Sequence, residues 1–185
     1  MSEVQGIPLF PEPLRFLLRP LPLFPLRLAL NRVVARFAAE RPAIFRRLGS
    51  HAEKVYLIDA VDLPFIFRLR PSAERPSIDL CRRAVSGARL GPWDARIAGP
   101  LAALLGMIHG SFDGDALFFS RDIVVEGDTE AVLALRNALD DAEIDLLSEA
   151  ARLLGPAGGV VERVGRGVLS EAGRLTGVSL VRAES

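Results

Sequence analysis

The chain has 185 residues, half of them hydrophobic, which is enough for one domain with its own core. Its 23 basic and 23 acidic residues cancel, so overall charge directs it neither to nucleic acid nor to a membrane. A single cysteine excludes an internal disulfide, and no apolar run reaches the about 18 residues that a membrane-spanning helix needs. With no basic and then apolar leader at the N-terminus, the sequence predicts a cytoplasmic protein.

Residues 6–25 contain six prolines interleaved with leucine and phenylalanine. Repeated proline excludes a long helix, because each ring removes a backbone donor and clashes with the preceding turn. The segment is therefore expected to be an arm without a long helix. Its apolar side chains would either lie across the protein's own surface or contact a membrane or a partner protein.

The next segment, residues 25–41, has the pattern of an amphipathic helix. Its apolar face carries Leu26, Leu30, Val33, Val34 and Phe37, and Arg27, Arg32 and Arg36 border that face. Such a helix suits an ordinary position on a protein core, with solvated arginines. It also suits a helix that lies in the headgroup layer of a membrane, although the spacing alone favours the ordinary position.

Short strands and helices follow in an order typical of an α+β fold. Apolar or alternating segments predict strands at 55–58, 65–69, 78–81, 93–97, 116–119 and 123–125. Helical spacing predicts helices at 43–48, 99–109, 129–139 and 142–154, with Asp128 or Thr129 as the cap of the third. We expect a mostly antiparallel sheet of about five strands with helices on one face. A glycine-rich linker and an amphipathic tail end the chain.

Few residues could carry chemistry. The two histidines and one cysteine do not have the spacing of a metal site, and Cys81 lies in a strand pattern typical of a buried, unreactive thiol. A small hydrolase or thioesterase that uses His109 or Cys81 is the enzymatic alternative. The sequence otherwise predicts a non-catalytic protein with no cofactor and no metal.

Residues 110–139 carry a resemblance to a known family. Residues 93–128 run strand, helix, strand, strand, and a helix follows from Thr129, as in the sterol carrier protein type 2 lipid-binding family. The motifs DGDALFFSRD (113–122), EGDTE (126–130) and LRNALDD (135–141) are more closely similar to the UbiT group, bacterial accessory factors of oxygen-independent ubiquinone biosynthesis. These motifs imply membership of the same lipid-binding fold.

The resemblance implies a hydrophobic tunnel that holds polyprenylated quinone precursors or other membrane lipids, with UbiU and UbiV as partners in the pathway. It divides the chain into an arm with an amphipathic helix (1–42), a lipid-binding domain (43–155) and a tail (156–185). The candidates for the lining are Phe65, Phe67, Trp93, Ile97, Leu101, Leu104, Leu105, Ile108, Phe112, Leu117, Phe118 and Leu133. The candidates for contact with the inner face of the cytoplasmic membrane are Leu26, Arg27, Leu30, Arg32, Val33 and Phe37. A scaffold of a membrane-associated biosynthetic complex, without a bound lipid, is the alternative.

Overall fold

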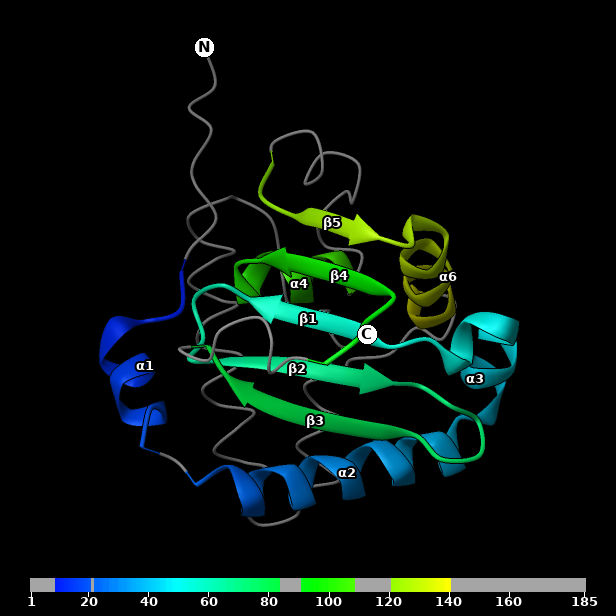
Figure 1. Ribbon diagram of the computed structural model, residues 1–185, viewed down its shortest axis with the longest axis horizontal. Helices are drawn as coiled ribbons and strands as arrows, with labels where there is room; N and C mark the ends of the chain where they lie inside the picture. Colours follow the sequence, from blue (N-terminus) through cyan, green and yellow to red (C-terminus); the bar gives the residue numbers. More distant parts are fainter. Residues whose placement is uncertain (1–8, 21, 84–90, 109–120, 141–185) are drawn as a thin grey trace, which may run out of the picture.

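The computed structural model describes residues 9–20, 22–83, 91–108 and 121–140 (Figure 1). Its helices are α1 (Glu12–Leu18), α2 (Leu23–Glu40), α3 (Pro42–Leu48), the 3₁₀ helix η1 (Gly49–Glu53), α4 (Leu101–Ile108) and α6 (Thr129–Asp140). Its strands are β1 (Tyr56–Ala60), β2 (Phe65–Arg70), β3 (Ser77–Arg82), β4 (Ala95–Gly99) and β5 (Val124–Gly127). The elements predicted within these ranges are present, with ends shifted by at most two residues. The predicted strand at 116–119 and everything after residue 140 lie outside the described residues.

The five strands form one sheet in the order β3-β2-β1-β4-β5. The central strand β1 pairs in parallel with β4, while the other three neighbouring pairs are antiparallel. Strands β1 and β2 follow one another along the chain and form an antiparallel hairpin, whereas the parallel strands β1 and β4 need a longer crossover connection. The predicted mostly antiparallel sheet is confirmed. In this register Ile58 lies between Phe67 of β2 and Ile97 of β4.

Because side chains alternate along a strand, the sheet has one apolar face and one charged face. The apolar face of β1 carries Tyr56, Ile58 and Ala60, and α3, α4 and α6 pack against it (Figure 1). Buried members of this core include Leu48 of α3, Leu104 of α4 and, from α6, Ala131, Leu135 and Ala138. The helices thus cover one face of the sheet, as an α+β layout requires.

The long helix α2 runs beside the edge strand β3 and is joined to it by hydrogen bonds and an ion pair (Figure 1). The side-chain amide of Asn31 donates to the carbonyl oxygen of Ile78 at 2.6 Å, and its oxygen accepts from the Ile78 N–H at 3.1 Å. Arg27 forms an ion pair of 2.6 Å with Asp79 in the same strand. The outward backbone groups of Ile78 in this edge strand are thereby occupied, which hinders pairing with another chain at this point. None of the described helices is long and apolar enough to cross a membrane.

The proline-rich arm contains a short helix, α1, that begins after Pro11 and has Pro13 in its first turn. Proline is tolerated there because the first helical N–H groups need no partner within the helix. Phe10 is buried, and its backbone N–H donates to the Asp62 carboxylate at 2.8 Å. The second oxygen of Asp62 accepts from the N–H of Leu101, the first residue of α4, at 2.9 Å. One buried carboxylate therefore holds the arm and the start of α4 together.

The junction of β5 and α6 depends on two consecutive residues. Gly127 has a φ of +79°, and a Cβ placed there would lie 2.3 Å from the Asp94 carbonyl oxygen. Asp128 caps α6, as predicted, by accepting from the Ala131 N–H at 2.9 Å. The chain's single lysine, Lys54, also pairs with Asp128. This hydrogen bond first, and the Ala131 N–H second, lower the pKa of the Asp128 carboxyl.

Candidate binding cavity

The central side chain of the apolar face is not fully covered. Ile58 is half-buried, although it occupies the middle of the central strand and its neighbours Tyr56 and Ala60 on the same face are inaccessible to solvent. Phe67, directly opposite Ile58 on β2, is also half-buried. A densely packed core would bury these two side chains most completely. The space between the sheet and the helices is therefore hollow at this point.

This hollow is a cavity of about 450 Å³ bounded by four helices and four strands. Its volume falls within the range of about 300–1,000 Å³ that is typical of pockets for small organic ligands. Its described lining consists of Leu30, Val33, Val34, Phe37, Ile44, Phe45, Leu48, Ile58, Phe67, Leu69, Pro71, Ile78, Ile97, Leu104, Leu105, Met107, Val132, Leu135, Arg136 and Leu139. Arg136 is the only charged side chain among these lining residues. Such a surface can hold an apolar chain by excluding water but offers little for hydrogen bonding.

Of the residues predicted to line a cavity, four do so: Phe67, Ile97, Leu104 and Leu105. Phe65 is buried and Leu101 packs against the core, but neither is part of the lining. The Ile108 side chain and Phe112, Leu117 and Phe118 lie outside the described residues.

Trp93 and Leu133 lie away from the cavity. Trp93 precedes β4, since the pairing of β4 with β1 begins at Ala95. Its ring instead covers Gly127, where an added Cβ would meet it at 2.9 Å. Leu133 is 54% exposed because it lies on the outer side of α6, while Val132 and Leu135 face inward.

The helix predicted to contact a membrane supplies a wall of the cavity instead. Leu30, Val33 and Phe37 of α2 are lining residues, so their apolar face turns towards the sheet. Leu26 is half-buried, Arg27 pairs with Asp79, and Arg32 is exposed. The helical spacing identified this face correctly, but spacing alone does not show what the face covers. The same signal marks Val132, Leu135 and Leu139 of α6, which the predicted lining omitted.

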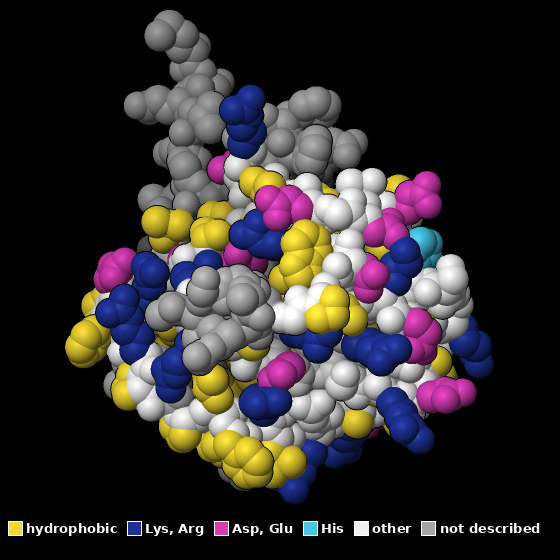
Figure 2. All heavy atoms as spheres, viewed as in Figure 1, with side chains coloured by type: hydrophobic (Ala, Val, Ile, Leu, Met, Phe, Trp, Pro, Cys, Tyr) yellow, Lys and Arg dark blue, Asp and Glu magenta, His cyan; other side chains and the backbone are white. Residues whose placement is uncertain are grey.

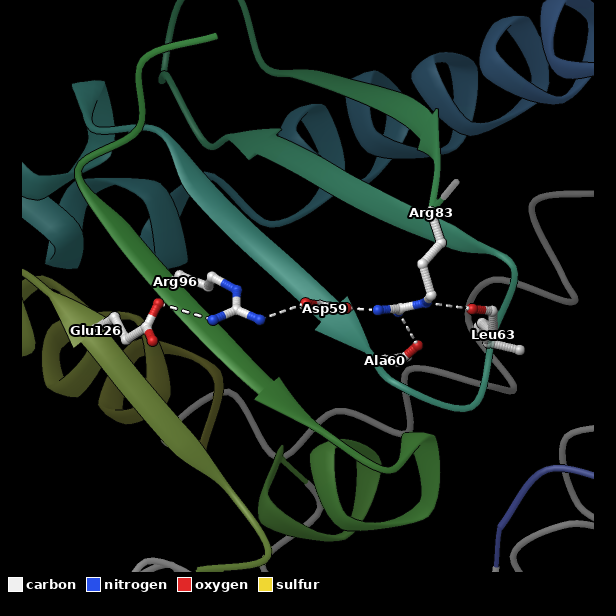
Figure 3. A network of polar contacts seen from close by, with 6 residues as sticks. All are labelled: Asp59, Ala60, Leu63, Arg83, Arg96 and Glu126. Atoms are coloured by element: carbon white, nitrogen blue, oxygen red, sulfur yellow. Dashed lines mark hydrogen bonds and ion pairs between the residues drawn. The ribbon is translucent and has the colours of Figure 1, made fainter. Parts of the chain in front are cut away.

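A cluster of charged residues lies on the face of the sheet opposite to the cavity (Figure 3). Asp59 of β1 is buried, and its two carboxylate oxygens accept from Arg83 and, at 2.6 Å, from Arg96. Arg96 also pairs with Glu126 of β5 at 2.7 Å, while Arg83 donates to the carbonyl oxygens of Ala60 and Leu63. The pairing with Asp59 and Glu126 raises the pKa of the Arg96 guanidinium. These groups satisfy one another, so the cluster joins neighbouring strands of the sheet.

The described residues do not assemble a catalytic or metal site. No group of three or more histidine, cysteine, aspartate or glutamate side chains within them could hold a metal ion. Cys81 lies on β3 away from the cavity, and burial raises the pKa of its thiol, which disfavours the reactive thiolate. His109 lies outside the described residues.

A five-stranded, mostly antiparallel sheet whose helices enclose an apolar cavity defines a class of small carrier-like α+β domains. Residues 30–140, more than half of the chain, match the SCP-2 sterol transfer family, and the protein belongs to that family. No curated protein sequence is significantly similar to the chain.

One solved structure shares the fold. The chain is similar to a UbiJ-SCP2 ubiquinone synthesis protein, with a TM-score of 0.51 and 21% sequence identity over 68% of this chain and 98% of that one. It is also similar to sterol carrier protein 2 from Yarrowia lipolytica in its apo form, with a TM-score of 0.42 and 13% identity over 60% of this chain and 88% of that one. At 21% identity the likeness to the UbiJ-SCP2 protein concerns the fold alone.

Proposed function

We propose that the protein is a non-catalytic lipid-binding factor that holds an apolar chain between its sheet and helices. The observation that carries this proposal is the half-buried pair Ile58 and Phe67 at the centre of the sheet, open to an apolar cavity of about 450 Å³. An apolar chain that leaves water for this cavity gains about 25 cal/mol for each Å² of its surface that is buried. Membership of the SCP-2 sterol transfer family supports the same role.

The test is to purify the full chain, extract bound lipid and identify it by mass spectrometry. Two variants of α6 sharpen it: Leu139→Trp adds bulk inside the cavity, and Leu133→Trp makes the same change on the exposed side of the helix. We expect the wild type and Leu133→Trp to retain lipid and Leu139→Trp to lose most of it. Circular dichroism should show that both variants are folded.

Recovery of no lipid from the wild type, together with no binding of a fluorescent fatty acid, would overturn the proposal. It would favour the alternative of a scaffold that acts through its surface. Retention of lipid by Leu139→Trp at the wild-type level would place the lipid outside this cavity.

We further propose that the cargo is a polyprenylated ubiquinone precursor and that the protein acts in the oxygen-independent pathway. The sequence resemblance of residues 113–141 to the UbiT group supports this, as does the fold shared with a UbiJ-SCP2 ubiquinone synthesis protein. By the same resemblance, UbiU and UbiV are the proposed partners. The prediction is that loss of the gene abolishes ubiquinone synthesis in cells grown without oxygen and spares it in cells grown with oxygen. Equal quinone content without oxygen in mutant and parent would contradict it.

We also propose peripheral docking on a membrane, through residues other than those expected from the sequence. Phe16 of α1 and Phe24 and Leu28 of α2 are 73%, 78% and 46% exposed. Hydrophobic side chains gather with basic ones over α1 and along α2 (Figure 2). Exposed aromatic residues with neighbouring arginines, here Arg19 and Arg32, suit the headgroup layer of an anionic membrane.

Sedimentation with vesicles tests this docking surface. Phe16→Ser combined with Phe24→Ser should release the protein from vesicles that contain 30% anionic phospholipid, and Leu133→Ser, an exposed leucine on α6, should not. We expect wild-type binding to weaken at high salt, because surface charges are screened. Equal sedimentation of all three proteins would contradict the proposal.

A further inference from the structure

The helices around the cavity differ in how firmly they are attached to the rest of the protein. Leu48 of α3, Leu104 of α4 and Leu135 of α6 line the cavity and are only 2%, 4% and 6% exposed. Helix α2 also supplies lining residues, but none of its 18 residues, all of them described, is buried. Moving α2 away from the sheet would therefore expose less hidden apolar surface than moving any of the other three helices.

The described polar contacts between α2 and the sheet lie at the edge strand β3. Asn31 exchanges two hydrogen bonds with the backbone of Ile78, and Arg27 forms an ion pair with Asp79. The side chains of Arg27 and Asp79 are 49% and 38% exposed, and Asn31 is half-buried. Water can therefore replace these partners when the helix and the strand part. Because Ile78 itself lines the cavity, a gap at this point leads directly into it.

The C-terminal end of α2 is held independently of β3. The ring of Phe37 packs edge-on against Phe45 of α3, with 6.3 Å between the ring centroids. One residue outside both helices, Arg41, then joins α2 to α3, which begins at Pro42. Residues between two elements can absorb the backbone rotation of a hinge. Helix α2 can thus move away from β3 and remain attached to α3.

From these contrasts we infer that α2 is a movable lid and that the ligand enters and leaves the cavity between α2 and β3. This inference rests on the proposed lipid-binding function and adds a route to it. The closed lid shields the apolar chain of the ligand from water, and separation of Asn31 from Ile78 opens the route. Elements that move to admit a ligand have few buried apolar contacts, as α2 has.

The first experiment separates the rates of ligand exchange from the affinity. Uptake and release of cis-parinaric acid, a fluorescent fatty acid, by the delipidated full chain are followed by stopped-flow fluorescence. Asn31→Ala removes two hydrogen bonds of the closed state and should raise both rate constants about fivefold to a hundredfold, with the dissociation constant nearly unchanged. Arg27→Ala should raise them less, because the ion pair that it removes is exposed.

The matched control is Gly127→Ala, which disturbs the junction of β5 and α6 rather than the attachment of α2. Its rate constants should equal those of the wild type. Equal acceleration by Gly127→Ala and Asn31→Ala would show that any loss of stability speeds exchange, and it would overturn the inference. Wild-type rate constants in a folded Asn31→Ala variant would overturn it as well.

A second experiment holds the lid closed. In a Cys81→Ser background, Arg27→Cys and Asp79→Cys place two thiols where the ion pair now joins α2 to β3, and a short bismaleimide links them. The linked protein should exchange cis-parinaric acid about tenfold or more slowly than the same variant treated with N-ethylmaleimide. Equal rates in the two samples would overturn the inference, and this comparison decides if Asn31→Ala does not fold.

Failure of the lid and failure of lipid binding give different results. If the wild type does not bind cis-parinaric acid at equilibrium, the proposed function itself is overturned. If it binds the probe, and the linked and unlinked proteins exchange it at the same rate, only the role of α2 as a lid is overturned.

Discussion

Asn31 of α2 pairs with both backbone polar groups of Ile78, so that a side chain of a helix occupies the position of a sixth strand at this point of the sheet. Ile78 lines the cavity, and the Asn31 pairing therefore positions a cavity wall as well as the helix above it. The Arg27–Asp79 ion pair is more exposed and contributes less. Of these two polar contacts between α2 and the sheet, the Asn31 pairing therefore contributes more.

Asn31→Ala should lower the free energy of unfolding by about 1–3 kcal/mol, because it leaves a partly buried donor and acceptor without partners. Urea denaturation followed by circular dichroism measures this change. Arg32→Ala, the next residue on the exposed side of α2, is the matched control and should change stability by less than about 0.5 kcal/mol. Equal effects of the two substitutions would show that the Asn31 pairing contributes nothing specific.

Asp59→Ala should destabilise the protein by about 3–5 kcal/mol, because it leaves Arg83 and Arg96 partly buried without their shared carboxylate. Glu126→Ala removes only the exposed partner of Arg96 and should cost no more than about 1 kcal/mol. Denaturant unfolding of both variants provides the comparison. A small effect at Asp59 would mean that water or another group replaces the carboxylate.

Gly127→Ala should destabilise the junction of β5 and α6 by about 1–3 kcal/mol or more, since it combines a positive φ with a collision against the Asp94 carbonyl oxygen. Gly91 also has a positive φ, of +66°, but an added Cβ there would come no closer than 3.9 Å to another residue. Gly91→Ala therefore measures the conformational cost alone. The difference between the melting temperatures of Gly127→Ala and Gly91→Ala therefore measures the cost of the clash between the added Cβ and the Asp94 carbonyl oxygen.

The stability should also fall at high pH because of Tyr56. Its hydroxyl donates to the His51 carbonyl oxygen at 2.9 Å, and its ring is inaccessible to solvent. Burial first, and then the charges of Asp128 and Asp94, raise the pKa of Tyr56 from 10.0 to about 12. The unfolded chain therefore loses this proton at a lower pH than the folded protein, and folding is disfavoured as the pH rises between these two values.

The free energy of unfolding should drop by about 2 kcal/mol between pH 10 and pH 12 from this residue. Denaturant unfolding at a series of pH values checks the slope. Tyr56→Phe should be less stable at neutral pH but should lack this part of the loss. A slope that is the same in both proteins would assign the loss to other groups.

Most of the secondary structure could be predicted from local patterns. The helix of residues 25–41, the strands around Ile58 and Phe67, and the cap at Asp128 follow from spacing, β-branched residues and capping chemistry, all of which act over a few residues. The predicted α+β fold class is confirmed, because it follows from the order of these helices and strands along the chain. The helix α1 was not predicted, because the six prolines of residues 6–25 argue against a helix, although Pro13 is tolerated in the first turn. The division into arm, domain and tail stays a prediction.

The cavity lining was predicted less completely. The apolar faces of α2 and α6 were visible in the sequence, but periodicity cannot show whether a face covers a core, a membrane or a hollow. Trp93 is an example: alternation placed it in line with Ala95 and Ile97, whereas the strand pairing begins after it and its ring covers Gly127 instead. Arg136, which shares this face of α6 with Val132, was not among the predicted lining residues either.

By itself, therefore, the sequence determined the elements, the mostly antiparallel sheet and the resemblance to a lipid-binding family, because these depend on local propensity and on specific runs of residues. Only the tertiary structure decided that the apolar face of α2 turns inward and that Ile58 and Phe67 border an unfilled space. The physical reason is that a cavity arises when side chains from several elements do not fill the volume between them. No single segment of the sequence encodes that volume.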